Sequence, residues 1–278
     1  MQLYEQLQYW ITERYAIMQR KEGGDGKPWS RDPVFQTTYF CNVRREDDKV
    51  TKWIRNNFSQ APNKKNYEWL MGLSRLLNHP PSLELWGHPV PITEERIAEY
   101  TEHLKYLNAT GTRVWGNAYV VTTHGMKMNK LDYLCHVLTE LLPVRGALAP
   151  YDNLYDASIE LQKFEGFGSF MTGQVLADLK NTGWHHFSTA KDWYTFSVPG
   201  PGSLRGMEWL HGGNIHKPKR RLWPERMKEL RERIWDDSEL VHIPKLCAQD
   251  IQNCLCEFDK YCRVFNSTGK SKRKYNGN

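Results

Sequence analysis

The stretch 154-LYDASIELQKFEGFGSFMTGQVLADLK-180 decides the fold class, because it places a glycine turn between two helical segments. We expect one helix over 152–164 and a second that runs from the turn Gly166-Phe167-Gly168 to Lys180. Glycine permits close approach and the second helix presents its positive N-terminal end, so the backbone N–H groups of the turn suit a phosphate. An ordinary tight connection between two packed helices is the other interpretation.

Helical periodicity extends on both sides of this hairpin, and no alternating apolar run is long enough to support a sheet of any size. The glycine-rich GGDGK (23–27) ends the first helix, and two adjacent prolines make 78–91 a loop. The sequence therefore predicts a mostly α-helical fold. The other helices are expected at 3–18, 29–58, 64–77, 93–107 (with Thr93 as its cap), 131–142, 224–235 and 246–265.

The longest stretch without clear periodicity covers residues 181–213 and is rich in glycine, proline, histidine and tryptophan. Long irregular segments in compact domains often carry function, so we expect an active-site loop here. His185 and His186 have no further ligands at suitable spacing and predict no metal site. Trp184 and Trp193 suit stacking on an unstacked base, although core packing is the simpler role.

Charge and hydropathy bound the class of protein. The net charge is +6, and much of it lies in KPKRR (217–221) and KSKRK (270–274), which favour an anionic partner; two solvated charge runs are the alternative. No apolar run approaches the roughly 20 residues that cross a bilayer, and the start MQLYEQLQYW lacks the apolar stretch of a secretory signal. We therefore expect a cytoplasmic protein.

The expected organisation has three parts. A helix and linker occupy 1–27, one helical enzyme unit with the hairpin near 152–180 occupies 28–265, and a basic tail at 266–278 is too polar to fold alone. Contacts to a phosphate backbone are predicted at the hairpin and at the first basic block: Gly166, Gly168, Ser169, Lys217, Lys219, Arg220 and Arg221.

Five blocks of sequence carry a family resemblance, most specifically GPGSLRG and CEFDKY. Over about residues 28–275 the chain resembles the α-glutamyl/putrescinyl thymine pyrophosphorylase family of phage amino-acid or amine:DNA transferases. It is similar also to the helical domain associated with 5-hydroxymethyl-deoxyuridine DNA kinases and, in architecture, to helix-hairpin-helix DNA glycosylases. The blocks are NVRREDD (42–48), GNAYVV (116–121), GFGSFMTGQ (166–174), DW with GPGSLRG (192–206) and DIQNCLCEFDKYCRV (250–264).

The resemblance implies a hypermodification step on phage DNA, in the cytoplasm of an infected bacterium. A 5-hydroxymethyluracil base is activated by phosphorylation, and this class of protein then replaces the phosphate or pyrophosphate with an amino acid or amine on a base flipped out of the duplex. The implied partners are double-stranded DNA, the amine co-substrate and other phage DNA-modification enzymes. Two alternatives stay open: a monofunctional DNA glycosylase, and a non-catalytic DNA-binding or kinase-partner module.

Asp192 and Arg205 are the leading catalytic candidates. Asp192 lies about where the glycosylase superfamily places its catalytic aspartate, and would stabilise the transition state or take a proton from the amine. Arg205 follows the GPGS turn and would grip the leaving phosphate with two donors, in a cradle completed by Gly200, Gly202 and Ser203.

A second polar cluster lies in NVRREDD (42–48), where Arg44 and Glu46 are further catalytic candidates. If this segment is helical, Asn42 and Glu46 share one face, and Arg44 and Asp48 share another; surface ion pairing is the alternative. For Glu257 and Lys260, an i,i+3 pair that stabilises a helix is equally compatible with the pattern. The remaining site candidates are Asn42, Glu257, Asp259, Lys260 and Trp193.

The six cysteines form no CxxC pair, which argues against a disulfide framework and a zinc ribbon. Four of them have nearly the spacing of the iron–sulfur loop of some glycosylases, but a continuous helix cannot point four thiolates at one cluster. Where related lyases carry a nucleophilic lysine, this chain has Ser169, Phe170 and Met171, which argues against Schiff-base chemistry. We expect no metal and no cofactor. The four cysteines are Cys247, Cys254, Cys256 and Cys262.

Binding through the DNA backbone predicts an affinity that falls steeply with salt and depends little on base sequence, because released counterions drive the association. Fluorescence anisotropy of two unrelated duplexes between about 50 and 200 mM salt measures both properties. Deleting residues 266–278 should weaken binding without abolishing turnover at high DNA concentration. An affinity that does not respond to salt would contradict this prediction.

Overall fold

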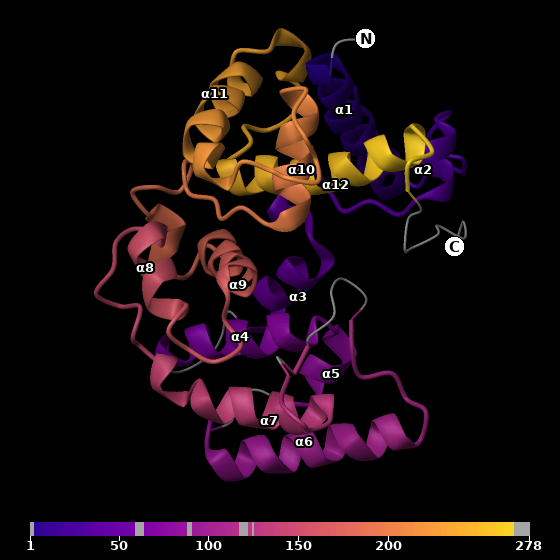
Figure 1. Cartoon of the computed structure of the whole chain (residues 1–278). Helices are drawn as coiled ribbons and strands as arrows, with labels where there is room; N and C mark the ends of the chain where they lie inside the picture. The colour runs from indigo at the N-terminus through magenta and orange to yellow at the C-terminus, as the bar shows by residue number, and fades with distance from the viewer. Residues whose placement is uncertain (1–2, 59–63, 88–90, 117–121, 124, 270–278) are drawn as a thin grey trace. The chain divides into compact units, whose positions relative to one another are not determined.

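The computed structural model describes residues 3–58, 64–87, 91–116, 122–123 and 125–269, and every regular element among them is a helix (Figure 1). The prediction of a mostly α-helical fold is confirmed. None of these helices has the length and apolar character needed to cross a membrane. The chain divides into two units, the first made of residues 1–48 and 194–278 and the second of residues 49–193.

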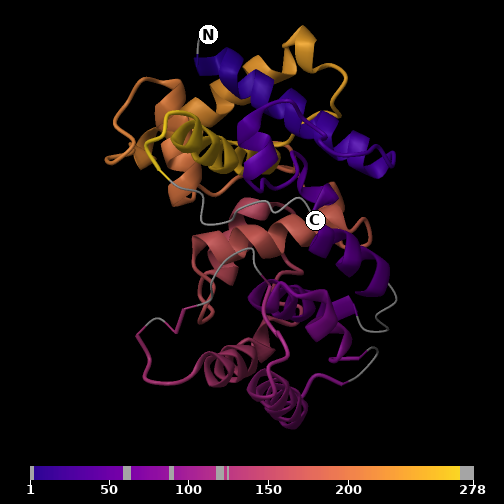
Figure 2. The same ribbon diagram turned by 90° about the vertical axis from the view of Figure 1, so that its right-hand side faces the viewer.

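The first unit is built around the helix α12 (Ala248–Phe265), whose apolar residues recur every three or four positions. Ile251, Leu255 and Phe258 are fully buried. The long N-terminal helix α1 (Leu3–Glu22) packs beside α12, as Figures 1 and 2 show. The other elements are α2 (Pro33–Thr37), η1 (Arg45–Asp47), α10 (Pro201–Leu210), η5 (Arg220–Leu222), α11 (Trp223–Trp235) and η6 (Ser238–Leu240).

The second unit surrounds the helix α4 (Tyr67–Leu77), which is buried along its whole length. Trp69 is part of this core and donates its indole N–H to the Leu138 carbonyl at 2.9 Å. The remaining elements are α3 (Lys49–Phe58), η2 (Lys64–Asn66), α5 (Pro80–Glu84), α6 (Glu94–Ala109), α7 (Lys130–Glu140), η3 (Leu142–Val144), α8 (Leu154–Leu161), α9 (Ser169–Asn181) and η4 (His186–Thr189).

The glycine turn joins two helices as predicted, α8 and α9. Gly166 has φ of 79°, and a Cβ there would lie 3.0 Å from Cγ1 of Val137, so conformation and space both require glycine. Polar caps fix the helix starts: Asn153 accepts from the backbone N–H of Asp156 at α8, and Thr93 caps α6 as predicted.

The predicted helix over 29–58 is wrong in its middle part. The chain leaves helical geometry between Thr38 and Arg44, so Asn42 and Glu46 share no helical face, and neither do Arg44 and Asp48. The reason is a set of tertiary contacts: carboxylates of α12 accept hydrogen bonds from backbone N–H groups of this segment.

Two predicted loops contain helices. Within 78–91, the adjacent prolines form the first turn of α5, where a missing N–H costs nothing. Within 181–213, the GPGSLRG block is the start of α10, with Gly200 as N-cap and Pro201 in the first turn. The expected active-site loop is therefore shorter than the sequence suggested.

The segment 1–27, predicted as an N-terminal helix and linker, lies in the first unit. Leu7, Trp10 and Ile11 of α1 are fully buried within the first unit, so the N-terminal helix belongs to its core. The chain stays folded beyond Phe265, since the backbone N–H groups of Thr268 and Gly269 donate to the Arg263 carbonyl. The basic block at 270–274 lies outside the described residues.

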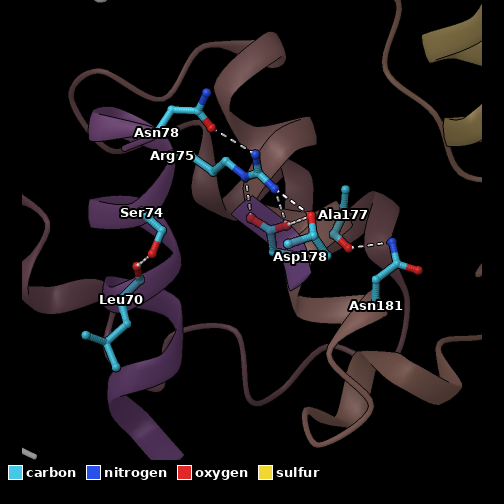
Figure 3. A network of polar contacts seen from close by, with 8 residues as sticks. Leu70, Ser74, Arg75, Asn78, Ala177, Asp178 and Asn181 are labelled. Atoms are coloured by element: carbon cyan, nitrogen blue, oxygen red, sulfur yellow. Dashed lines mark hydrogen bonds and ion pairs between the residues drawn. The ribbon is translucent and has the colours of Figure 1, made fainter. Parts of the chain in front are cut away.

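A buried ion pair ties three helices of the second unit together (Figure 3). Arg75 of α4 reaches across to Asp178 of the hairpin helix α9 and contacts both carboxylate oxygens. Thr51 of α3 accepts from Arg75 Nη2 and donates to Asp178, each at 2.7 Å. Arg75 also donates to the Asn78 side chain at 3.1 Å, so the guanidinium is fully engaged at the end of α4.

Replacing Arg75 with methionine should lower the free energy of unfolding by about 3 to 5 kcal/mol, because Asp178 would keep a buried, uncompensated charge. The matched control is Lys163→Met, which breaks an exposed pair with Glu160 and should change the free energy of unfolding little, because solvent screens that pair. Urea denaturation of both variants measures the difference. Equal losses would contradict a structural role for the buried pair.

Candidate functional site

The polar face of α12 binds the extended segment 39–45, and the two run antiparallel. Lys260 Nζ donates to the Tyr39 carbonyl at 3.1 Å, and Glu257 accepts from the Cys41 N–H at 3.1 Å. One and two turns further back, Asn253 donates to the Asn42 carbonyl at 2.9 Å, and Asp250 accepts from the Arg45 N–H at 2.7 Å. Positions 250, 253, 257 and 260 share one helix face, which therefore binds backbone groups of the segment 39–45.

The side chains of this segment are partly engaged among themselves. Asn42 accepts from the guanidinium of Arg14 and donates to the Asp47 carbonyl at 2.7 Å. Arg44 pairs with Glu46, and both side chains are partly exposed. Among the described residues, Nη1 of the partly buried Arg14 has no hydrogen-bond partner, and neither do Nε and Nη2 of the buried Arg45. Arginines and carboxylates therefore alternate in this part of the first unit, and most of their contacts are made to one another or to the backbone.

Arg205 of α10 binds Asp259 of α12, through Nε at 3.0 Å and Nη2 at 2.9 Å. Asp259 also accepts from the Trp209 indole at 3.2 Å and from Arg263 Nε at 3.2 Å. The predicted site residues Arg205 and Asp259, 54 residues apart in sequence, are thus brought together. Lys260 pairs with Glu257 at 2.6 Å on the other side of the helix.

The rest of the expected phosphate cradle has packing roles. A Cβ at Gly202 would collide with Cys256, and one at Gly206 would collide with the Leu255 backbone, so these glycines allow α10 to cross α12 closely. Ser203 is buried and bonds both backbone groups of Gly200 through its hydroxyl. A phosphate role for Gly200, Gly202 and Ser203 stays a prediction, while Arg205 is the member of the set whose side chain is partly exposed.

The first basic block forms an exposed cationic surface in the first unit. Its four charged side chains are exposed and make no ion pair within the part of the chain that the structure describes. The Lys219 backbone N–H donates to Glu208 at 2.8 Å, which anchors the segment to α10. The four residues are Lys217, Lys219, Arg220 and Arg221.

The hairpin turn lies in the second unit. Gly168 is exposed, Ser169 is half-buried, and the helix α9 begins at Ser169 without a side-chain cap. Phe167 is buried beneath the turn. Backbone N–H groups in the first turn of a helix lack partners within it, which suits an oxyanion. DNA contact by Gly166, Gly168 and Ser169 stays a prediction.

Asp192 also belongs to the second unit, where it caps a hairpin helix. Its two carboxylate oxygens accept from the backbone N–H groups of Leu154 at 2.7 Å and Tyr155 at 3.0 Å, at the start of α8. The Lys180 ammonium lies over the ring of the adjacent Trp193, with Nζ 4.1 Å from the ring centre. Asp192 therefore has a structural function, and its catalytic role stays a prediction.

The remaining histidine, tryptophan and cysteine candidates differ in exposure: His186 is exposed, Trp184 is partly buried and Cys262 is buried. His186 contacts the Tyr151 carbonyl at 3.0 Å, and Trp184 lies 3.9 Å from the ring of Tyr67. No group of three or more potential metal ligands occurs among the described residues. Burial raises the pKa of Cys256 to about 11 and that of Cys262 to about 12, so both thiols are protonated at neutral pH.

Sequence reasoning missed Arg263 and Trp209, which share Asp259 with Arg205. A signal was present, because Asp259 and Arg263 stand at i,i+4 spacing and Arg205 and Trp209 do so as well. It also missed the Arg75–Asp178 pair, for which the sequence offers no local signal. The block GNAYVV at 116–121 lies outside the described residues except for Gly116.

Comparison with known proteins gives one family and one relative. A family model described as the 5-hmdU DNA kinase helical domain matches residues 1–271. A 5-hmdU DNA kinase of Bacillus phage SP10 is 27% identical over 223 residues, which cover 72% of this chain and 35% of that protein. The chain thus spans about a third of the length of this curated relative. No solved structure matches.

Replacing Asp192 with alanine should lower the free energy of unfolding by about 0.5 to 2 kcal/mol, because two N–H groups of α8 lose their acceptor. Asp192→Asn should cost less, since one acceptor oxygen remains. The control is Asp152→Asn, whose exposed carboxylate lies two residues before the same helix.

If Asp192 is catalytic as predicted, Asp192→Asn also lowers turnover by orders of magnitude. Full activity of this variant would instead assign the catalytic role to Glu46 or Glu257.

Proposed function

The chain belongs to the family of the 5-hmdU DNA kinase helical domain, and we propose that it is a phage DNA-hypermodification transferase. Its substrate is DNA in which 5-hydroxymethyl-deoxyuridine carries a phosphate or pyrophosphate on the exocyclic oxygen. An amino acid or amine replaces that group. The relative's name supports the substrate base, since that kinase acts on 5-hmdU in DNA.

The observation that carries the proposal is the ion pair between Arg205 and the buried carboxylate of Asp259, in which the Arg205 side chain stays partly exposed. In the reaction the C–O bond at the exocyclic carbon breaks, and its electron pair leaves with the (pyro)phosphate. The amine nitrogen forms the new C–N bond and loses one proton. Negative charge therefore develops on the leaving group, and a fixed cation beside it lowers the barrier.

A carboxylate base would take the proton that the amine releases. Asp192 is the candidate from the family resemblance. Glu46 and Glu257 are the alternatives in the unit that holds Arg205. Of these two, Glu46 is the more exposed side chain, whereas Glu257 already accepts from Lys260 and the Cys41 N–H.

The DNA would be held through its backbone. The exposed block at 217–221 supplies four cationic side chains, and the hairpin turn supplies backbone N–H groups. Neither contact reads base sequence, so the choice of base depends on the modification and on extrusion from the stack.

A second candidate is a module that binds DNA beside a kinase. The observation that favours it is the match to one helical domain of a larger kinase, about a third of which corresponds to this chain. Such a module would bring phosphorylated DNA and kinase together without breaking a covalent bond. The hairpin keeps a glycosylase as the remaining alternative, which would release free base.

Turnover on phosphorylated 5-hydroxymethyluracil DNA should depend on Arg205. Arg205→Ala should lose roughly a hundredfold or more in kcat/KM, and Arg205→Lys should recover only part, because an ammonium lacks the two-pronged geometry. Mass spectrometry of nucleosides after incubation with candidate amines detects the aminated product.

The controls use DNA with plain thymine or unphosphorylated 5-hydroxymethyluracil, both of which should stay unchanged because hydroxide is a poor leaving group. Free base and abasic sites in place of an aminated nucleoside would establish the glycosylase. Binding without any covalent change, across a panel of amines, would establish the module.

A further inference from the structure

One buried carboxylate, Asp259, orients two arginines from two helices. Arg205 comes from α10 and Arg263 from α12, and both donate through Nε to the same oxygen, Oδ2. The other oxygen, Oδ1, accepts from the Trp209 indole. Every polar contact of the carboxylate is therefore made by a side chain that α10 or α12 presents at the crossing of these helices.

Exposure differs sharply within this cluster. The Asp259 side chain is 1% exposed, whereas those of Arg205 and Arg263 are 33% and 30% exposed. The Nε edges of both arginines face the buried carboxylate. Nη1 of Arg205 and both Nη groups of Arg263 make no hydrogen bond or ion pair among the described residues. The contacts through Nε orient both guanidinium groups, and both side chains keep about a third of their surface exposed.

The charge of the cluster favours an anion. Arg205 neutralises Asp259, and Arg263 then adds a positive charge that the cluster does not compensate. Asp259 already has Arg205 and the Trp209 indole as partners, so its charge is compensated without Arg263. A pair of oriented guanidinium groups matches the oxygens of a phosphate far better than a single arginine does.

The turn after α12 leaves space for the Arg263 guanidinium. The backbone N–H groups of Thr268 and Gly269 donate to the Arg263 carbonyl at 2.9 and 3.1 Å. A Cβ at Gly269 would lie 3.3 Å from Arg263 Nη1, so glycine lets the chain pass close to the guanidinium.

We infer that Arg205 and Arg263 together form the binding site for the phosphate or pyrophosphate leaving group, and that Asp259 is the positioning residue that aims them. The identity of this phosphate rests on the proposed function, whereas the two-arginine site rests on the geometry at Asp259. Arg263 is thereby a substrate-binding residue, and Trp209 helps to hold Asp259 in place.

Direct binding of inorganic pyrophosphate tests the site without any need for turnover. Isothermal titration calorimetry compares the full chain with Arg205→Ala, Arg263→Ala, Arg263→Lys and the control Lys228→Ala, which removes one exposed charge from α11. The two arginine-to-alanine variants should each weaken pyrophosphate binding at least tenfold. Arg263→Lys should recover part of the loss, and Lys228→Ala should stay within twofold.

Asp259→Asn separates orientation from simple charge. It raises the net charge by one, so electrostatics alone would strengthen pyrophosphate binding, whereas loss of the positioning contact should weaken it severalfold. Trp209→Phe, which removes one donor to Asp259, should weaken binding in the same direction and keeps the test available if Asp259→Asn fails to fold. Thermal melting monitors the fold of both.

Unmodified duplex DNA separates the two sources of phosphate. Arg263→Ala should leave the affinity for this duplex within twofold; an equal loss for duplex and pyrophosphate would assign the arginines to the DNA backbone and overturn the inference. Unchanged pyrophosphate binding in Arg263→Ala would overturn it as well. Pyrophosphate binding that depends on both arginines, with no aminated product from any amine, would support the site and refute the transferase.

Discussion

The close crossing of α10 over α12 is the constraint on which the candidate site depends. Gly202 and Gly206 face Cys256 and Leu255, and neither contact leaves space for a Cβ. Because the helices approach so closely, the guanidinium of Arg205 reaches the buried Asp259 and still keeps a third of its side chain exposed. If the helices crossed at a greater distance, Arg205 would have to extend further into the protein to reach Asp259, and less of its side chain would be exposed. Gly202 and Gly206 thus have a packing role that brings Arg205 to Asp259, whatever part the loop takes in binding a phosphate.

Several carboxylates in this protein accept hydrogen bonds from backbone N–H groups, so an acidic residue at a candidate site can have a structural role. Asp250 and Glu257 hold the extended segment 39–45, and Asp192 caps α8. Buried N–H groups must find acceptors, so an acidic residue beside irregular backbone is a structural element before it is a catalyst. The two roles are compatible, because a carboxylate that accepts from two N–H groups has a fixed orientation and keeps further lone pairs.

Periodicity in the sequence was enough to predict α1, α6, α7, α11 and α12 and the glycine turn before α9, because each has a continuous apolar face or a polar cap. It failed where tertiary contacts compete with local preference. Segment 39–45 has helix-compatible residues, yet the polar face of α12, more than 200 residues away, takes its backbone N–H groups. The start of α10 looked like a loop, because glycine and proline are normally helix breakers.

The sequence was enough to predict which residues belong to the candidate site, but not how their side chains contact one another. Arg205, Glu257, Asp259 and Lys260 were each singled out, whereas the sharing of Asp259 by two arginines follows only from the fold. This arrangement distinguishes the candidate chemistries. A glycosylase breaks the bond between base and sugar and has no phosphate to release at the base, so two partly exposed guanidinium groups would bring it no such transition-state stabilisation. A transferase that expels pyrophosphate would gain from both cations at the moment the C–O bond breaks, and this is why we prefer it to the glycosylase in our proposal.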